Sequence, residues 1–304
     1  MTFLNLIRWK NLVMIAMVQL LLKYAFLESF GAQTSLNTLG ITLLILATVC
    51  IAAAGNIIND ICDVETDFIN KPDKLIIGNT ISEKTAYNLF IILNVLGVGI
   101  GFYLSHWVGK SAFFSIFVII SVLLYVYATY LKQTFLIGNI VISLLVALSI
   151  LIVGVFELLP SITSLNRQVQ LTYFEVIFNY AVFAFIVNLL REIVKDLEDI
   201  EGDVKTNMNT LPIVLGKKTT HIVLILLSFF TIILVVNHVM SSLYKYNIAV
   251  LYFLALVVGP LIYASIKIIM AQQKKDYIHI SYVLKLVMLF GMFSLFLYAF
   301  IFAK

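Results

Sequence analysis

Charged residues are scarce in this sequence. Asp, Glu, Lys and Arg make up 12% of its 304 residues, and 62% are hydrophobic. This composition lies far from that of soluble globular domains and of disordered chains, so it excludes both classes. Cysteine is also scarce. Cys50 and Cys62 are the only two, and they lie in or beside one apolar run, which excludes a disulfide framework and indicates packing residues.

Long apolar runs dominate what remains, and nine of them are close to the roughly 20 residues that a membrane-spanning helix needs. These runs cover residues 12–30, 39–62, 85–104, 112–131, 135–156, 174–194, 219–237, 248–269 and 281–302. No low-complexity segment or long linker separates them. We therefore predict one all-α domain, residues 1–304, that is a polytopic membrane protein with nine transmembrane helices. Its first residues lack a small-residue cleavage site, so we expect an uncleaved start.

Acidic residues are concentrated, because eleven of the sixteen fall in residues 55–74 (GNIINDICDVETDFINKPDK) and 191–205 (REIVKDLEDIEGDVK). The aspartates of these two stretches are Asp60, Asp63 and Asp67, and Asp196, Asp199 and Asp203. Steps of three and four residues return to one helix face, so each triplet is expected to form one stripe about 10 Å long. A constant offset of 136 residues relates the two triplets. Chance rarely produces this register.

The spacing of the aspartates indicates a metal site. Carboxylates stacked this closely repel one another, and hard divalent cations relieve the repulsion. Mg²⁺ takes one or two carboxylates per ion and completes its octahedron with water and phosphate oxygens. The stripes therefore predict a Mg²⁺-diphosphate site. A solvated acidic helix end is the alternative for either triplet alone, and two triplets in register disfavour it.

Lysine and arginine predict the orientation, because they accumulate in cytoplasmic loops. With the N-terminus inside, thirteen of them lie on the cytoplasmic side and four lie outside. The chain is thus expected to be an integral membrane protein, in the cell membrane if it is prokaryotic. Its N-terminus and both acidic stretches would be cytoplasmic, with the C-terminus outside. The two stretches then lie at the same ends of the second and sixth spans and are able to face each other.

A diphosphate also needs positive charge on its free oxygens. The candidate side chains near the acidic stretches are Lys74, Lys132, Lys195 and Lys205. Each of these lysines also fits a role in setting the membrane orientation alone. Lys132 is the strongest candidate for phosphate binding, because its loop is otherwise uncharged. Tyr130, close to Lys132, is placed to offer a ring face to a carbocation. Ordinary packing is the alternative for Tyr130, since the chain has 23 Phe and 15 Tyr.

Two phrases resemble the motifs of a known family. NDICDVETD matches the N-D-x-x-D-x-x-x-D motif of the UbiA superfamily of intramembrane prenyltransferases, and DLEDIEGD matches its D-x-x-D-x-x-x-D motif. The wider phrases INDICDVETDFINKPDK and REIVKDLEDIEGDVKTNMNTLP look most like the branch that makes digeranylgeranylglyceryl phosphate. Relatives usually have Arg-Pro where this chain has Lys74 and Leu75. That departure bears on the phosphate role of Lys74.

The resemblance implies a nine-helix fold and a role for each motif residue. Asp60, Asp63 and Asp67, assisted by Asn59, would hold one Mg²⁺, and Asp196, Asp199 and Asp203 would hold another. A prenyl diphosphate would bridge the two ions. The acceptor would be geranylgeranylglyceryl phosphate, whose phosphate is expected near Arg8 or Lys10, with a family-like asparagine at Asn11.

The implied partners are a prenyl diphosphate, a lipid-soluble acceptor and membrane lipids, with no nucleic acid and no obligatory protein partner. Two alternatives stay open. One is an aromatic prenyltransferase of quinone or pigment synthesis, which has the same donor site. The other is a cation-coupled transporter, in which intramembrane acids bind ions. The acids here lie at span ends, and no proline interrupts the second or sixth span, so the transporter is disfavoured.

Overall fold

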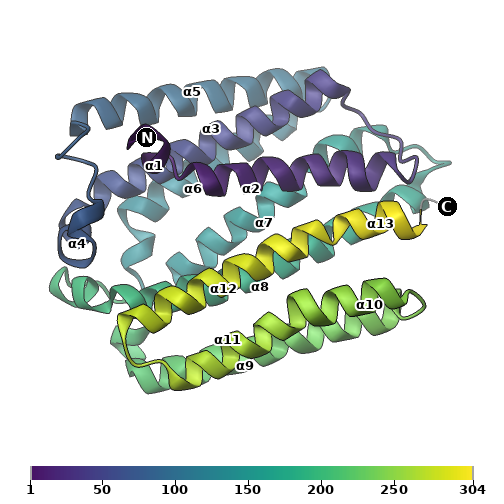
Figure 1. Cartoon of the computed structure of the whole chain (residues 1–304). Coiled ribbons are helices and arrows are strands. Elements are labelled where there is room, and N and C mark those ends of the chain that lie inside the picture. The colour runs from purple at the N-terminus through teal and green to yellow at the C-terminus, as the bar shows by residue number, and fades with distance from the viewer. Residues whose placement is uncertain (1, 303–304) are drawn as a thin grey trace. The chain divides into compact units, whose positions relative to one another are not determined.

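The computed structural model describes residues 2–302, and the side chains of Lys74 and of residues 301 and 302 fall outside that description. Its α-helices are α1 Thr2–Leu6, α2 Trp9–Leu20, α3 Thr38–Cys62, α4 Val64–Asn70, α5 Glu83–Trp107, α6 Phe114–Thr129, α7 Ile137–Glu157, α8 Arg167–Lys205, α9 Leu211–His238, α10 Asn247–Phe253, α11 Gly259–Met270, α12 Lys274–Phe293 and α13 Leu295–Phe302 (Figure 1). The described residues form no β-strand. Nine helical segments among them are long and apolar enough to cross a membrane, which confirms the predicted all-α fold.

Helices α9 and α12 begin eight and seven residues before their apolar runs, and α8 extends furthest beyond its run. This helix has 39 residues and continues eleven residues past the predicted end at Val194. At about 1.5 Å per residue it is roughly 58 Å long, well beyond a hydrocarbon core of about 30 Å. It ends after Lys205, where Asn207 takes a left-handed conformation and the Met208 N–H bonds the Asp203 carbonyl at 2.9 Å. This is a Schellman-type end, and it keeps the second motif on continuous helix.

Side-chain caps fix the starts of the helices on either side of the first motif. The Asn37 carboxamide accepts from the Gly40 N–H at 2.9 Å at the start of α3. The Ser82 hydroxyl accepts from the Thr85 N–H at 3.2 Å at the start of α5. Such caps satisfy N–H groups that have no partner inside the helix. The two caps therefore fix the first turns of α3 and α5.

The chain divides into two compact units. The first consists of Met1–Lys132 and Leu148–Ile177, and the second of Gln133–Ala147 and Phe178–Lys304. Helices α7 and α8 contribute residues to both units. The first aspartate motif belongs to the first unit and the second motif to the second unit. The prediction of one domain for the whole chain stays a prediction.

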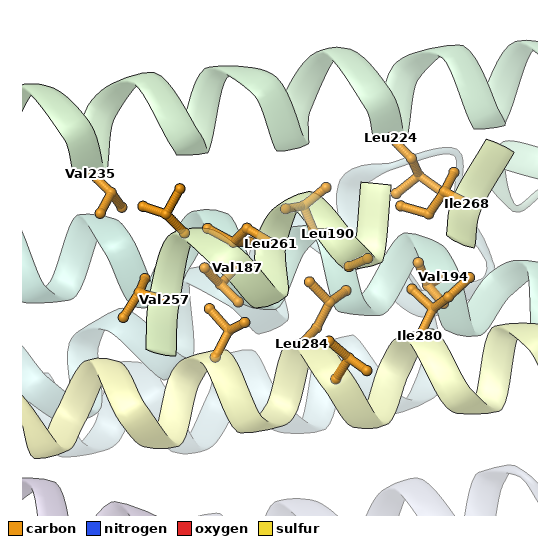
Figure 2. Close-up of a cluster of buried hydrophobic side chains, with 14 of the residues drawn as sticks. Val187, Leu190, Val194, Leu224, Val235, Val257, Leu261, Ile268, Ile280 and Leu284 are labelled. Atoms are coloured by element: carbon orange, nitrogen blue, oxygen red, sulfur yellow. The ribbon is translucent and has the colours of Figure 1, made fainter. Parts of the chain in front are cut away.

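Small residues allow close helix packing in the first unit. A Cβ added at Gly97 on α5 would lie 2.6 Å from Ile51 Cγ1 and 3.0 Å from the Ala47 carbonyl oxygen on α3. Glycine is therefore required for this approach of α5 to α3. In the second unit, the core is formed by branched aliphatic side chains of α8, α9, α11 and α12. Val187, Leu190, Leu261 and Leu284 meet at its centre (Figure 2).

A buried ion pair lies at the other end of the first unit's spans from the aspartates. Lys23 is 2% exposed and Glu157 is fully buried, with Nζ 3.2 Å from the carboxylate. Lys23 also donates to the Leu36 carbonyl at 2.7 Å and to the Thr34 hydroxyl at 2.9 Å. Glu157 accepts from the Leu36 N–H at 3.1 Å. The pair thus fixes the segment between the first two spans.

Candidate active site

The first motif spans a break between two helices. Helix α3 ends at Cys62, Asp63 has φ −95° and ψ 2°, and the short helix α4 follows. The Asp63 N–H bonds the Asn59 carbonyl at 2.9 Å and the Asp67 N–H bonds the Asp63 carbonyl at 2.7 Å. The expectation of one continuous helical stripe is therefore wrong for this motif. The four-residue hydrogen bonds persist, but the axis is interrupted at Asp63.

Two cations and one amide gather on the carboxylates around this break. Arg8 Nη2 lies 2.7 Å from Asp60 Oδ1. Lys132 Nζ, whose side chain is 8% exposed, donates to Asp63 Oδ1. The Asn59 amide donates to the other Asp63 oxygen at 2.6 Å. Two residues distant in sequence, Arg8 and Lys132, and the neighbouring Asn59 thus converge on two aspartates of the first unit.

The backbone at Arg8 is unusual. Its φ of 53° and ψ of 50° lie in the left-handed region, which a residue with a Cβ rarely adopts. The Asn56 amide, one turn before Asp60 on α3, donates to the Ile7 carbonyl at 2.9 Å and holds this segment. Such conformations cost on the order of 1–3 kcal/mol and cluster at functional sites. The strained turn directs Arg8 toward Asp60.

Burial disfavours the ionised form of Asp67 in the first motif. Burial, followed by the negative charge of Asp63, raises the pKa of Asp67 to about 6. Among the described residues, no three His, Cys, Asp or Glu side chains converge into one metal-binding group. The three aspartates of a motif are therefore not arranged as a threefold ligand set. Carboxylate donors in ones and twos still fit Mg²⁺, which completes its octahedron with water and phosphate.

The second motif stands on the continuous C-terminal part of α8. Asp196 accepts from the Asn139 amide of α7 at 2.9 Å. Asp203, which is buried, accepts from the Thr210 hydroxyl at 3.4 Å. Asp199 lies 4.0 Å from Lys274 Nζ. Each aspartate of this triplet therefore has a polar or charged neighbour within the second unit.

The remaining candidate residues for substrate binding are Lys195, Lys205, Tyr130, Asn11 and Lys74. Lys195 donates to Glu192 at 2.8 and 3.0 Å, so its contacts lie one turn before Asp196. Lys205 is exposed, Tyr130 is 65% exposed, and Asn11 is partly buried near the start of α2. The Lys74 side chain lies outside the described residues. Their substrate-binding roles stay predictions.

The sequence analysis missed Asn139 and Glu157. Asn139 is a polar residue inside an otherwise apolar span, and Glu157 is an isolated acid outside the two acidic stretches. Polar groups that are costly to bury in a membrane are a signal for both. Their partners lie 57 and 134 residues away in the sequence, so the contacts themselves were not readable.

Comparison with known proteins assigns the family. Residues 20–290 match the model of the UbiA prenyltransferase family. The chain belongs to this family. It is therefore a prenyltransferase and an integral membrane protein, as the two motifs predicted, and family membership favours prenyl transfer over cation transport.

Several relatives of this UbiA member are similar over most of its length. The digeranylgeranylglyceryl phosphate synthase of Methanosphaera stadtmanae is 32% identical, over 83% of this chain and 86% of the relative. That of Pyrococcus abyssi is 31% identical, over 76% of this chain and 75% of the relative. A solved structure described as digeranylgeranylglyceryl phosphate synthase in membranes has a TM-score of 0.64 and 28% identity, covering 98% of this chain and 97% of that one.

More distant structures share the fold of this UbiA member. A UbiA homologue from Aeropyrum pernix has a TM-score of 0.67 at 15% identity, covering 90% of this chain and 94% of its own. A UbiA homologue from Archaeoglobus fulgidus, solved with GPP and Mg²⁺, has a TM-score of 0.57 at 17% identity, covering 97% of this chain and 99% of its own. These similarities confirm the all-α fold, in which the described residues include nine helical segments able to cross a membrane.

Proposed function

We propose that this chain transfers a geranylgeranyl group from geranylgeranyl diphosphate to the free hydroxyl of geranylgeranylglyceryl phosphate. The relatives from Methanosphaera stadtmanae and Pyrococcus abyssi are named for this product. At the site, the observation that supports prenyl transfer is the gathering of Arg8, Asn59 and Lys132 on Asp60 and Asp63. Carboxylates with cations around them are suited to a metal-bound diphosphate.

We assign one Mg²⁺ to the first motif, where one or two of Asp60, Asp63 and Asp67, with Asn59, would hold it. We assign another to the second motif, where one or two of Asp196, Asp199 and Asp203 would hold it. The oxygen-only donors of both motifs fit this hard cation, and a distant relative was solved with GPP and Mg²⁺. When bound, Mg²⁺ neutralises charge on the diphosphate and makes it a better leaving group.

Side chains of the first unit act on the charges that develop during transfer. The bond from the allylic carbon to the diphosphate oxygen breaks, an ether bond forms to the acceptor oxygen, and pyrophosphate and the hydroxyl proton leave. Lys132 is placed to stabilise the departing pyrophosphate. Arginine has five N–H donors, so Arg8 is able to contact Asp60 and a phosphate together. Apolar spans limit capture of the allylic cation by water.

The proposal is tested by offering the purified chain several acceptors with labelled geranylgeranyl diphosphate and Mg²⁺. Digeranylgeranylglyceryl phosphate is the expected labelled product. An uncharged aromatic acceptor should give none. Efficient prenylation of the aromatic acceptor, with none of the glyceryl phosphate lipid, would instead support the aromatic prenyltransferase.

The cytoplasmic orientation of the N-terminus and of both motifs is also a proposal. Asn79 is exposed in the segment between α4 and α5. In a background without Cys50 and Cys62, Asn79→Cys should react with an impermeant maleimide in inverted vesicles but not in intact cells. Leu165→Cys, between α7 and α8 and 97% exposed, is the matched control and should react only in intact cells. The reverse labelling of the pair would reverse the topology.

Arg8 is expected to bind the acceptor phosphate. One lost charged hydrogen bond is worth about 1.5–3 kcal/mol, so Arg8→Ala should raise the KM of the acceptor roughly 10- to 150-fold. The KM of the prenyl diphosphate should rise less. Because Arg8 also contacts Asp60, we expect an accompanying change in the Mg²⁺ concentration that gives half-maximal activity. Steady-state kinetics with each substrate varied would measure these effects, with the exposed Lys10→Ala as the comparison. An unchanged acceptor KM would remove Arg8 from the acceptor site.

A further inference from the structure

The first motif contains asparagine and the second, residues 191–205, does not. In the first, Asn59 immediately precedes Asp60 and its amide donates to Asp63 at 2.6 Å. The 136-residue offset that superposes the aspartates places Lys195 at the position of Asn59. Lys195 has no carboxamide and donates to Glu192. The second motif therefore lacks the amide donor that the first has in its own sequence.

Helix α7 supplies an amide to the second motif from elsewhere in the chain. Asn139 Nδ2 donates to Asp196 Oδ2 at 2.9 Å, and the Asn139 residue is 8% exposed. Leu136, just before α7, has a left-handed φ of 59°, and its carbonyl accepts from the Ile140 N–H at 3.0 Å. This turn fixes where α7 begins. It places Asn139 in the first turn, within reach of Asp196.

Hydrogen bonds on its other side also hold Asn139. The backbone carbonyl of Asn139 accepts from the Ser143 hydroxyl at 2.6 Å. That hydroxyl accepts from the side-chain amide of Asn188 at 3.2 Å. Ser143 is fully buried and Asn188 is 3% exposed. Asn188 lies on α8, eight residues before Asp196. A buried polar network that is well satisfied is rigid, so the Asn139 amide presents a fixed donor to Asp196.

We propose that Asn139 is a positioning residue of the second Mg²⁺ site. By holding one oxygen of Asp196, its amide fixes the orientation of the carboxylate, whose other oxygen would bind the cation. This inference rests on the proposed function, since that function assigns Asp196 to Mg²⁺. Groups that orient metal ligands in this way typically contribute about 10- to 100-fold to metal affinity or activity.

Asn139→Leu removes the amide and keeps the number and branching of the side chain's heavy atoms. The full chain, purified in detergent without substrates, would be titrated calorimetrically with Mg²⁺ and with Mn²⁺. We expect the affinity of one cation equivalent to fall roughly 10- to 100-fold. In the prenyl transfer assay, the Mg²⁺ concentration for half-maximal rate should rise by a similar factor, and kcat at saturating Mg²⁺ should change less.

Ser143→Ala is the matched control, because it disrupts the same polar network without touching Asp196. It should lower the thermal midpoint and reduce cation affinity much less than Asn139→Leu does. Asn139→Asp is a second variant that remains informative if the leucine variant folds poorly. It places a carboxylate against Asp196, so its thermal midpoint should be low in chelator and should recover in excess Mg²⁺ by more than that of the unaltered chain.

Equal cation affinity in Asn139→Leu and the unaltered chain would overturn the proposal and leave Asn139 a link between helices. So would an Asn139→Asp variant whose thermal midpoint is insensitive to Mg²⁺. Failure of the proposed function would give a different experimental result. In that case the unaltered chain itself binds no divalent cation, or Asp199→Ala binds cations as tightly as the unaltered chain does.

Discussion

Asp63→Ala is expected to abolish prenyl transfer, and Asp199→Ala is expected to do the same. Asp63 accepts from both Asn59 and Lys132, so its loss removes a proposed Mg²⁺ ligand and leaves the buried Lys132 without its carboxylate. Metal assistance is worth several kcal/mol, and a loss of about 4 kcal/mol lowers the rate about 10³-fold. Initial rates with saturating substrates would measure the loss.

Glu65 and Glu201 provide matched controls, because they are exposed acids of the same two stretches and are related by the same offset. Glu65→Ala and Glu201→Ala should keep most of the activity. Thermal midpoints in detergent would show that the inactive variants remain folded. Full activity of the unaltered chain in excess chelator would contradict a Mg²⁺ requirement, whatever the variants do.

The second large effect concerns stability. Glu157→Ala leaves Lys23 charged and almost fully buried, with its buried carboxylate partner removed and only the half-exposed Glu28, 3.6 Å away, as a remaining carboxylate partner in the described residues. Breaking a buried ion pair from one side typically destabilises a protein by about 3–5 kcal/mol. We expect a large fall in the thermal midpoint of the detergent-solubilised chain, measured by intrinsic fluorescence. Prenyl transfer at low temperature should be affected much less.

Replacing both partners separates the charge from the packing. Lys23→Met with Glu157→Leu removes both charges and should recover most of the lost stability, because apolar pairs of similar volume replace buried ion pairs well. Glu175→Ala removes an exposed acid from α8 and should change little. If Glu157→Ala had the same thermal midpoint as the unaltered chain, the ion pair would have no part in holding the segment between the first two spans.

Hydropathy alone predicted the spans, because each apolar run is close to the length that a bilayer requires. It missed the length of α8 because residues 195–205 are charged. Glu and Lys are good helix formers, so the helix continues after its apolar run ends. Hydropathy detects where lipid contact ends, whereas hydrogen bonding and the Asn207 cap decide where the helix ends.

The motif aspartates were also found from sequence, because their spacing is local. The break at Asp63 was not predicted, since it preserves the three- and four-residue steps on which the spacing argument depends. Arg8, Lys132 and Asn139 reach the aspartates through contacts that are distant in sequence. Local periodicity has no information on such contacts. Lys132 was singled out only because its surroundings are otherwise uncharged.

The helix break at Asp63 makes the two motifs mechanically different. Asp67 stands on the seven-residue helix α4, which joins α3 through a single non-helical residue. Small rotations about the backbone of Asp63 move Asp67 and leave Asp60 in place. Asp196, Asp199 and Asp203 share one unbroken rod and move only together. Within the first motif, Asp67 is thus able to change its position relative to Asp60, whereas the aspartates of the second motif keep their spacing.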